Sequence, residues 1–133
     1  MLDIALPVLN KEQTKKNVLQ ALKKYYLFLS SIDERDIERV QDGKVIGVSE
    51  TVLERINYIQ EIRKGVEELN MLDKQLIELA YLGKEKPNWV KVCRILNMSQ
   101  ADYYRKRNKA LCELAYKLGV EVEKGTFTNY KKY

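Results

Sequence analysis

Histidine is absent from this 133-residue sequence. Its absence removes the commonest general base, the Ser-His and Cys-His nucleophile pairs and most catalytic zinc sites. The six glycines are scattered and never form the GxGxxG or GxxxxGK loops that bind phosphates. No metal-ligand spacing surrounds Cys93 and Cys112, which favours reduced thiols in an intracellular protein. We therefore expect no enzyme activity, no metal site and no other cofactor.

Long hydrophobic runs are also missing. No segment approaches the roughly 20 apolar residues of a membrane span. The first residues, MLDIALPVLNKEQTKK, include a short apolar stretch with no basic region before it. These features predict a cytoplasmic protein without a membrane partner, and the 45% hydrophobic content is ordinary for a chain with its own core.

Proline occurs only at Pro7 and Pro87, and apolar residues recur at intervals of three and four, so the sequence predicts an all-α fold. Asn10 and Ser49 are suitable N-caps for helices over residues 10–30 and 49–69. Between these helices, residues 31–48 are charged and then turn-like, which indicates a short helix and a connector. Residues 1–70 are thus predicted to form an N-terminal helical unit.

The second long helix carries an apolar stripe that must be buried. Its members step by three and four residues along one face: Val52, Ile56, Ile59, Ile62, Val66 and Leu69. Packing on the first helix, which offers Val18, Leu22, Tyr25 and Leu29, is the favoured interpretation. A homodimer seam is the alternative, although the stripe is shorter than the three to four heptads typical of a coiled coil.

The C-terminal half predicts three closely spaced helices. They cover residues 73–82, ended by Gly83, then 89–96, and then 99–118, ended by Gly119. Asn97 can adopt a left-handed conformation between the last two, and Met98 can fill the angle there. Ser99 and Asp102 form a capping box at the start of the last helix. This is the layout of a helix-turn-helix, so residues 71–119 are predicted to be a DNA-binding domain.

Residues 120–133 form a tail after this domain. Val120 and Val122 alternate with polar residues and are followed by a Lys124-Gly125 turn, which is compatible with a hairpin over residues 120–128. Disorder of residues 130–133 is an equally good interpretation.

Positive charge is concentrated in the C-terminal part of the chain. Residues 1–82 contain 12 Lys/Arg and 14 Asp/Glu, whereas residues 83–133 contain 12 Lys/Arg and 5 Asp/Glu. Such asymmetry is typical of a protein in which one half binds a polyanion. A solvated basic surface would give the same composition. The charge therefore indicates polyanion binding only in combination with the helix-turn-helix pattern.

The last helix carries the candidate DNA contacts. The face opposite Tyr103, Ala110 and Leu114 is predicted to read base edges in the major groove, through Gln100, Ala101, Tyr104, Arg105 and Asn108. Side chains flanking that face are predicted to bind phosphates: Lys91, Lys106, Arg107 and Lys109. Trp89 is expected to anchor its helix to the core.

The stretch from Leu69 to Leu118 resembles region 4 of bacterial sigma factors, and resembles the ArpU-type phage regulators more closely. The matching residues are Ser99, the Tyr103-Tyr104-Arg105 segment and the Lys109-Ala110-Leu111 segment. Cys93 and Asn97 stand where a sigma-like motif has a small residue and glycine, and Asp102 replaces a hydroxyl residue. The resemblance implies a transcriptional regulator of late phage or prophage genes that binds double-stranded DNA.

Three other functions remain as alternatives. A protein-interaction module would dock on RNA polymerase or another regulator, and the acidic N-terminal half fits that interpretation. Non-specific RNA binding is weaker, because sequence-reading RNA modules present aromatics on sheets or loops. A resolvase-like recombinase fragment is weakest, because residues 1–82 hold too few clustered arginines for its active site.

Overall fold

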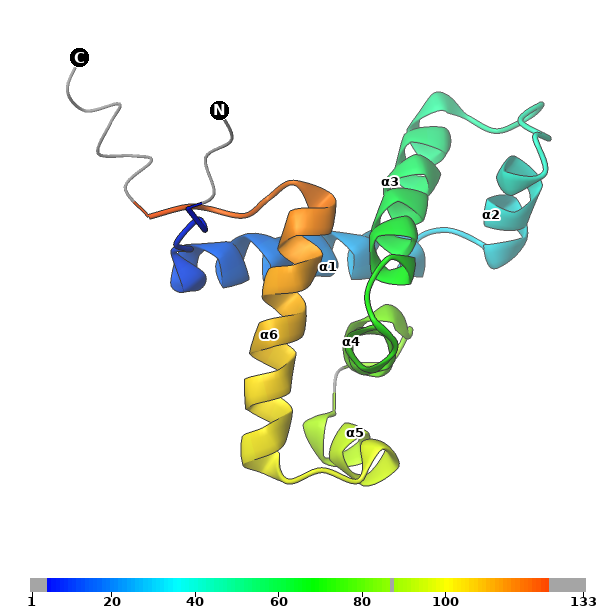
Figure 1. The fold of residues 1–133 in the computed structure, drawn as a ribbon. Helices are drawn as coiled ribbons and strands as arrows, with labels where there is room; N and C mark the ends of the chain where they lie inside the picture. Colours follow the sequence, from blue (N-terminus) through cyan, green and yellow to red (C-terminus); the bar gives the residue numbers. More distant parts are fainter. Residues whose placement is uncertain (1–4, 87, 125–133) are drawn as a thin grey trace, which may run out of the picture.

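The computed structural model describes residues 5–86 and 88–124, and it confirms the all-α prediction (Figure 1). The helices are α1 (Lys11–Ser30), α2 (Glu34–Gln41), α3 (Glu50–Glu67), α4 (Met71–Ile77), the π-helical turn η1 (Glu78–Leu82), α5 (Trp89–Leu96) and α6 (Gln100–Leu118). Within the described residues there is no strand, and β-type pairing is limited to one antiparallel bridge between Leu9 and Glu123.

The predicted helix starts are confirmed by their capping hydrogen bonds. The side chains of Asn10, Ser49 and Ser99 each accept a bond from the backbone N–H three residues later, at 3.1, 3.2 and 3.1 Å. Each bond satisfies one of the backbone donors that a helix start leaves free. These local signals place α1, α3 and α6 correctly.

The helix predicted over residues 73–82 differs from the structure at both ends. It begins at Met71, because Asn70 is the N-cap and its side-chain oxygen accepts the Asp73 N–H at 2.9 Å. Its regular α-helical part ends at Ile77, and the chain continues as η1 to Leu82. Gly83 ends the segment as predicted, but with extended rather than left-handed backbone angles (φ −79°, ψ 166°).

One hydrophobic core joins both halves of the chain. The α3 stripe is buried against α1, with Ile56 and Ile59 fully inaccessible, and the same core includes Leu76 of α4 and Leu111 of α6. The favoured interpretation of that stripe is therefore confirmed. A homodimer stays a prediction, and it would have to use a surface other than this stripe.

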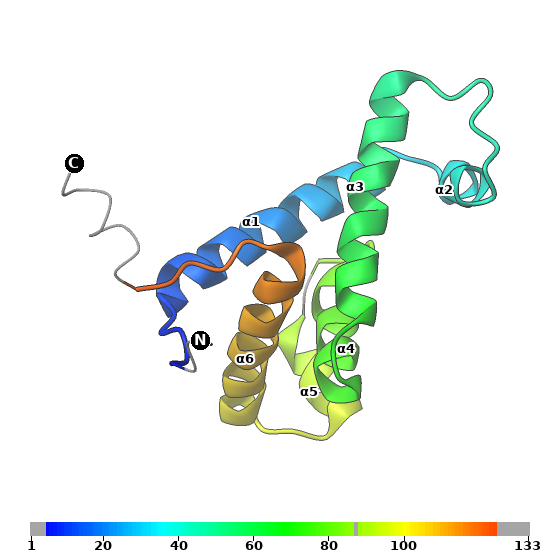
Figure 2. The same cartoon turned by 45° about the horizontal axis from the view of Figure 1, so that its top comes forward.

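Helices α3 and α6 approach each other closely at Gly65. A Cβ atom at this position would lie 2.8 Å from Cδ2 of Leu118, so the absence of a side chain lets the two helices meet. As a result, α6 stands with its C-terminal half among α1 and α3 and its N-terminal half beside α4 and α5 (Figure 2).

The segment that follows α6 pairs with the start of the chain. The backbone N–H of Asn10 donates to Val122 O at 2.8 Å, and the N–H of Lys124 donates to Val8 O at 2.6 Å. Residues 120–124 therefore pair with residues 8–10 rather than with each other. The rest of the predicted hairpin, residues 125–128, and the predicted disorder at 130–133 lie outside the described residues.

Candidate nucleic-acid interface

Helices α5 and α6 and the three residues between them form one unit, here called the α5–turn–α6 unit (residues 89–118). Asn88 caps α5 by accepting bonds from the N–H groups of Val90 and Lys91, at 3.1 and 3.3 Å. Asn97 ends α5 in the left-handed conformation, with φ 53° and ψ 56°, as predicted. Ser99 then caps α6. The chain thus changes direction within three residues and presents the start of α6 next to α5.

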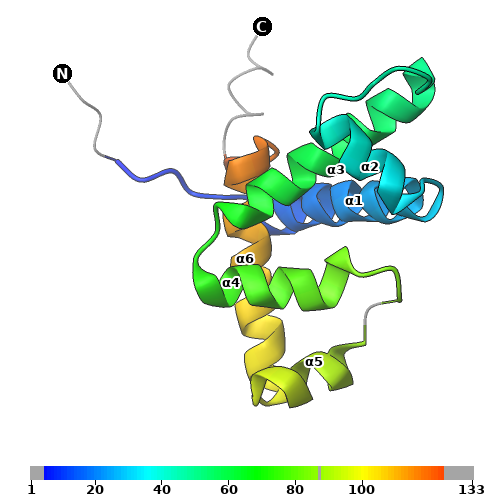
Figure 3. The same ribbon diagram turned by 90° about the vertical axis from the view of Figure 1, so that its right-hand side faces the viewer.

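Apolar contacts fix how this unit is oriented. Val92 of α5 and Tyr103 of α6 are buried, and Met98 packs against the same core from the turn, as predicted. Burial raises the pKa of Tyr103 to about 12, with a further contribution from the neighbouring Tyr81 hydroxyl. Helix α5 and the N-terminal half of α6 lie at one end of the molecule, with α2 and α3 toward the other (Figure 3).

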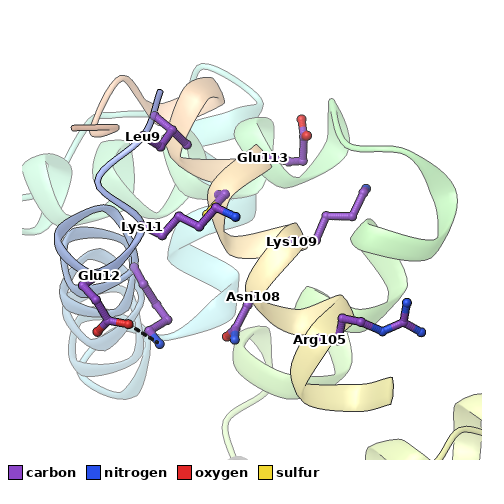
Figure 4. A pocket seen from close by; sticks show the side chains of 9 residues that line it. Leu9, Lys11, Glu12, Arg105, Asn108, Lys109 and Glu113 are labelled. Atoms are coloured by element: carbon purple, nitrogen blue, oxygen red, sulfur yellow. Dashed lines mark ion pairs between the residues drawn. The ribbon is translucent and has the colours of Figure 1, made fainter. Parts of the chain in front are cut away.

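The exposed face of α6 is centred on residues spaced by four. Ala101, Arg105 and Lys109 are all exposed, and Arg105 and Lys109 extend from the same side of the helix (Figure 4). Positions spaced by four lie one above another on a helix. Lys109, predicted to flank the base-reading face, therefore shares that face with Arg105. Gln100 is exposed in the first turn, and Asn108 is half-buried at the margin.

Tyr104 is turned further inward than predicted. Its ring centre lies 5.2 Å from that of Tyr103 and 6.3 Å from that of Trp89, and the Arg107 guanidinium lies 5.0 Å above it. Trp89 itself keeps 38% of its surface exposed, so it packs on Tyr104 and is not a buried anchor. Tyr104 remains half-buried, and only part of its surface can reach a ligand.

The four side chains predicted to bind phosphates are held differently. Lys91 is exposed at the start of α5, with its Nζ 3.8 Å from a Glu85 carboxylate oxygen. Lys106 is half-buried on α6. Arg107 is also half-buried: its Nη2 donates to the Asn108 side-chain oxygen at 3.1 Å, and its Nε finds no partner among the described residues. Lys91 and Lys106 are thus freer to reach a phosphate than Arg107.

Two ion pairs modulate the charge of the exposed face. The Asp102 carboxylate accepts a bond from Arg105 Nη2 at 2.7 Å, and this bond lowers the Asp102 pKa. Asp102 was expected to bond back to the backbone of its cap, and the structure instead places its carboxylate against Arg105. Both partners are solvent-exposed, so the pair contributes little stability and can be exchanged for a ligand at low cost.

The second pair joins Lys109 to Asp73 of α4, and the sequence did not predict it. Lys109 Nζ lies 3.1 Å from Asp73 Oδ2, while the Asp73 side chain is only 4% exposed. The Asn70-to-Asp73 spacing is a capping pattern and could have identified Asp73 as a helix-start residue. Its contact with α6 is tertiary and has no signal in the sequence.

The described part of the chain offers neither a metal-binding cluster nor a membrane-spanning helix. Residues 5–86 and 88–124 contain no cluster of three or more His, Cys, Asp or Glu side chains that could hold a metal ion. None of the helices in these ranges is both long enough and apolar enough to span a bilayer.

The fold and the site together define a class: an all-helical protein that presents a basic helix beside a short capped helix. The chain belongs to the family described as a protein of unknown function (DUF1492), whose model matches residues 46–115. It is also similar to an uncharacterized phage-related protein of Listeria innocua serovar 6a. The two sequences are 24% identical over 137 positions, covering 90% of this chain and 96% of the relative. No solved structure gives a significant match.

Proposed function

We propose that this protein binds duplex DNA in a sequence-specific manner through the α5–turn–α6 unit and regulates transcription in a phage or prophage. The observation that carries the proposal is the exposed face of α6, where Arg105 and Ala101 lie in the first two turns after a capped start. A helix-turn-helix reads the major groove with the N-terminal residues of its second helix. The phage-related relative supports the biological setting. Neither catalysis nor a cofactor is part of the proposal.

Arg105 is the proposed principal base contact. Its guanidinium can donate two parallel bonds to guanine O6 and N7 once it leaves Asp102. Gln100 in the first turn can pair with adenine, and Ala101 can contact a thymine methyl group. Asn108, and Tyr104 through the exposed part of its ring, complete the proposed reading face.

Three of the proposed phosphate contacts flank this face, and the fourth, Lys109, lies on it beyond Arg105. Lys91 lies at the start of α5, and Lys106 lies on α6 beside Arg105. Arg107 is included with a smaller expected effect, because the protein already holds it against Tyr104. Lys109 is paired with Asp73, but its side chain is 59% exposed and can also reach a phosphate. Such contacts position the protein and add affinity without reading sequence.

The test begins with a duplex selected from a randomised pool by the wild-type chain, with a scrambled duplex of equal length for comparison. Arg105→Ala should weaken binding to the selected duplex by about 1–3 kcal/mol and binding to the scrambled duplex far less. Lys109→Ala should weaken binding to both duplexes alike and reduce the salt slope by about one. Fluorescence anisotropy titrations at several salt concentrations measure both quantities.

Arg35→Ala is the matched control. Arg35 is an exposed arginine of α2 that also pairs with a nearby aspartate, Asp33, at 3.1 Å. Arg35→Ala changes the net charge as Arg105→Ala does. Its affinity for both duplexes should stay at the wild-type value, apart from a small loss caused by the lower net charge. Equal losses on selected and scrambled duplexes for Arg105→Ala would refute its assignment as a base contact.

A second candidate function is docking on RNA polymerase or another regulator. It is favoured by exposed apolar side chains on α4 and α5, namely Met71, Leu72, Val90 and Ile95, which are 70%, 40%, 45% and 53% exposed. Such surface is common at protein interfaces. Failure of the wild-type chain to enrich any duplex, together with co-sedimentation with polymerase that is lost in Ile95→Lys, would favour this function over DNA binding.

A further inference from the structure

A groove of about 490 Å³ runs between the first turns of α1 and the exposed face of α6 (Figure 4). Among the side chains that line it, four are cationic and two are carboxylates. The cations are Lys11 and Lys15 from α1 and Arg105 and Lys109 from α6, and the carboxylates are Glu12 and Glu113. The groove therefore joins the predicted recognition helix to a part of the chain that sequence reasoning left without a specific role.

Both α1 lysines act electrostatically on the surface of α6. Burial raises the pKa of the Cys112 thiol on α6, and the positive charges of Lys11 and Lys15 oppose that effect. The Lys15 Nζ lies 3.7 Å from a carboxylate oxygen of Glu12; the Lys15 side chain is 27% exposed and the Glu12 side chain is 79% exposed. Because the Glu12 carboxylate is well exposed, the pair contributes little stability, and the Lys15 ammonium group can exchange Glu12 for another anion.

The pairing of residues 8–10 with residues 120–124 holds α1 in this position. The Thr14 hydroxyl is fully buried, accepts a bond from the Val122 N–H at 3.0 Å and lies 3.3 Å from Val122 O. The Asn17 side-chain amide donates to Val120 O at 3.1 Å. The start of α1 is thus tied to the chain that leaves α6, so Lys11 and Lys15 keep a fixed place relative to the exposed face.

Helix α6 stands between this end of α1 and the α4–α5 side of the molecule (Figure 2). A helix lying in the major groove, which is roughly 12 Å wide, has a phosphate backbone on each side. Lys91 of α5 is available to one backbone. The opposite backbone would run past the groove lined by α1.

We propose that Lys11 and Lys15 bind phosphates of the DNA backbone on the side of α6 opposite α5. This inference rests on the proposed DNA-binding function and extends the interface to the N-terminal helix, which lies outside the residues matched by the family. The contacts carry no sequence information, because every nucleotide presents the same phosphate.

The test compares Lys11→Gln/Lys15→Gln with the control Lys16→Gln/Lys23→Gln in the full chain. Both double variants remove two charges from α1, and Lys16 and Lys23 are exposed residues that do not line this groove. The probe is a duplex selected from a randomised pool by the wild-type chain, titrated from 50 to 200 mM salt. Thermal unfolding followed by circular dichroism checks that both variants fold.

Two phosphate contacts contribute about 1.8 to the slope of log K against log salt concentration, at roughly 0.9 each. When salt rises fourfold, the affinity of the wild type should therefore fall about 12-fold further than the affinity of Lys11→Gln/Lys15→Gln. The ratio of selected to scrambled binding should be the same for both proteins. The control should keep the wild-type slope. Equal slopes for the two double variants, with the wild type binding its selected duplex, would overturn this inference alone. Failure of the wild type to select any duplex would overturn the proposed function and this inference together.

Discussion

Replacing Lys109 by alanine tests whether a proposed DNA contact also stabilises the fold. Lys109 Nζ lies 3.1 Å from Asp73 Oδ2, and the Asn70 side-chain amide donates to the same oxygen at 3.1 Å. Without Lys109, the almost fully buried Asp73 carboxylate loses its cationic partner. Breaking a buried pair costs about 3–5 kcal/mol, whereas an exposed pair contributes about 0.2–1 kcal/mol.

The structure places this pair between those limits. The Asp73 side chain is 4% exposed, but the Lys109 side chain is 59% exposed, so water can replace part of the lost interaction. We therefore expect Lys109→Ala to lower the free energy of unfolding by about 1–2 kcal/mol.

A double-mutant cycle with Asp73→Asn isolates the interaction, measured by urea unfolding. Asparagine keeps the shape of Asp73 without its charge, so Lys109→Ala in that background should cost less than about 0.5 kcal/mol. Lys117→Ala, an exposed lysine further along α6, is the control and should be neutral. A loss of the same size in both backgrounds would refute the proposed dependence on the Asp73 charge. DNA titrations of Lys109→Ala should then be carried out at a temperature at which the variant is fully folded.

Three other changes test the structure. Asn97→Ala should lower stability by about 1 kcal/mol and Asn97→Gly should not, because φ is +53° there; equal stability of the two variants in urea would contradict this. Thr14→Val should cost about 1–3 kcal/mol, because it leaves the Val122 N–H without its buried acceptor; wild-type stability would contradict it. Tyr103 has a folded pKa raised to about 12, above its unfolded value, so its stabilising effect is complete below about pH 10 and is lost from pH 10 to 12. The stability difference between the wild type and Tyr103→Phe should change over that range, and a constant difference would contradict it.

The α5–turn–α6 unit could be predicted because its signals are local. Ser99 is a side-chain cap three residues before its partner, and Asn97 tolerates a positive φ, so both act within one turn of chain. The burial of Tyr103 and Leu114 follows from helical periodicity in the same way. Such features depend on neighbours in sequence, and the structure reproduces them.

Other features depend on contacts between distant segments and could not be predicted. The position of Tyr104 is set by Trp89 on another helix, and the environment of Lys109 is set by Asp73 on α4. The pairing of residues 120–124 with residues 8–10 joins the two ends of the described chain. A sequence pattern gives the face of a helix but not which helix covers it, so the proposed role of Lys11 and Lys15 had no sequence signal.

The two halves of α6 explain why one helix can serve both the fold and a ligand. In the C-terminal half, Leu111, Leu114 and Ala115 are fully buried, so substitutions there should act through stability. In the N-terminal half, Ala101 and Arg105 are exposed, so substitutions there should act through binding. Because a single rigid helix joins the halves, the core fixes the direction in which Arg105 points. The family match ends at Ala115 and so spans both halves. Because the core holds the far end of α6, the proposed recognition helix would need little reorganisation on binding DNA, and this would lower the entropic cost of forming the complex.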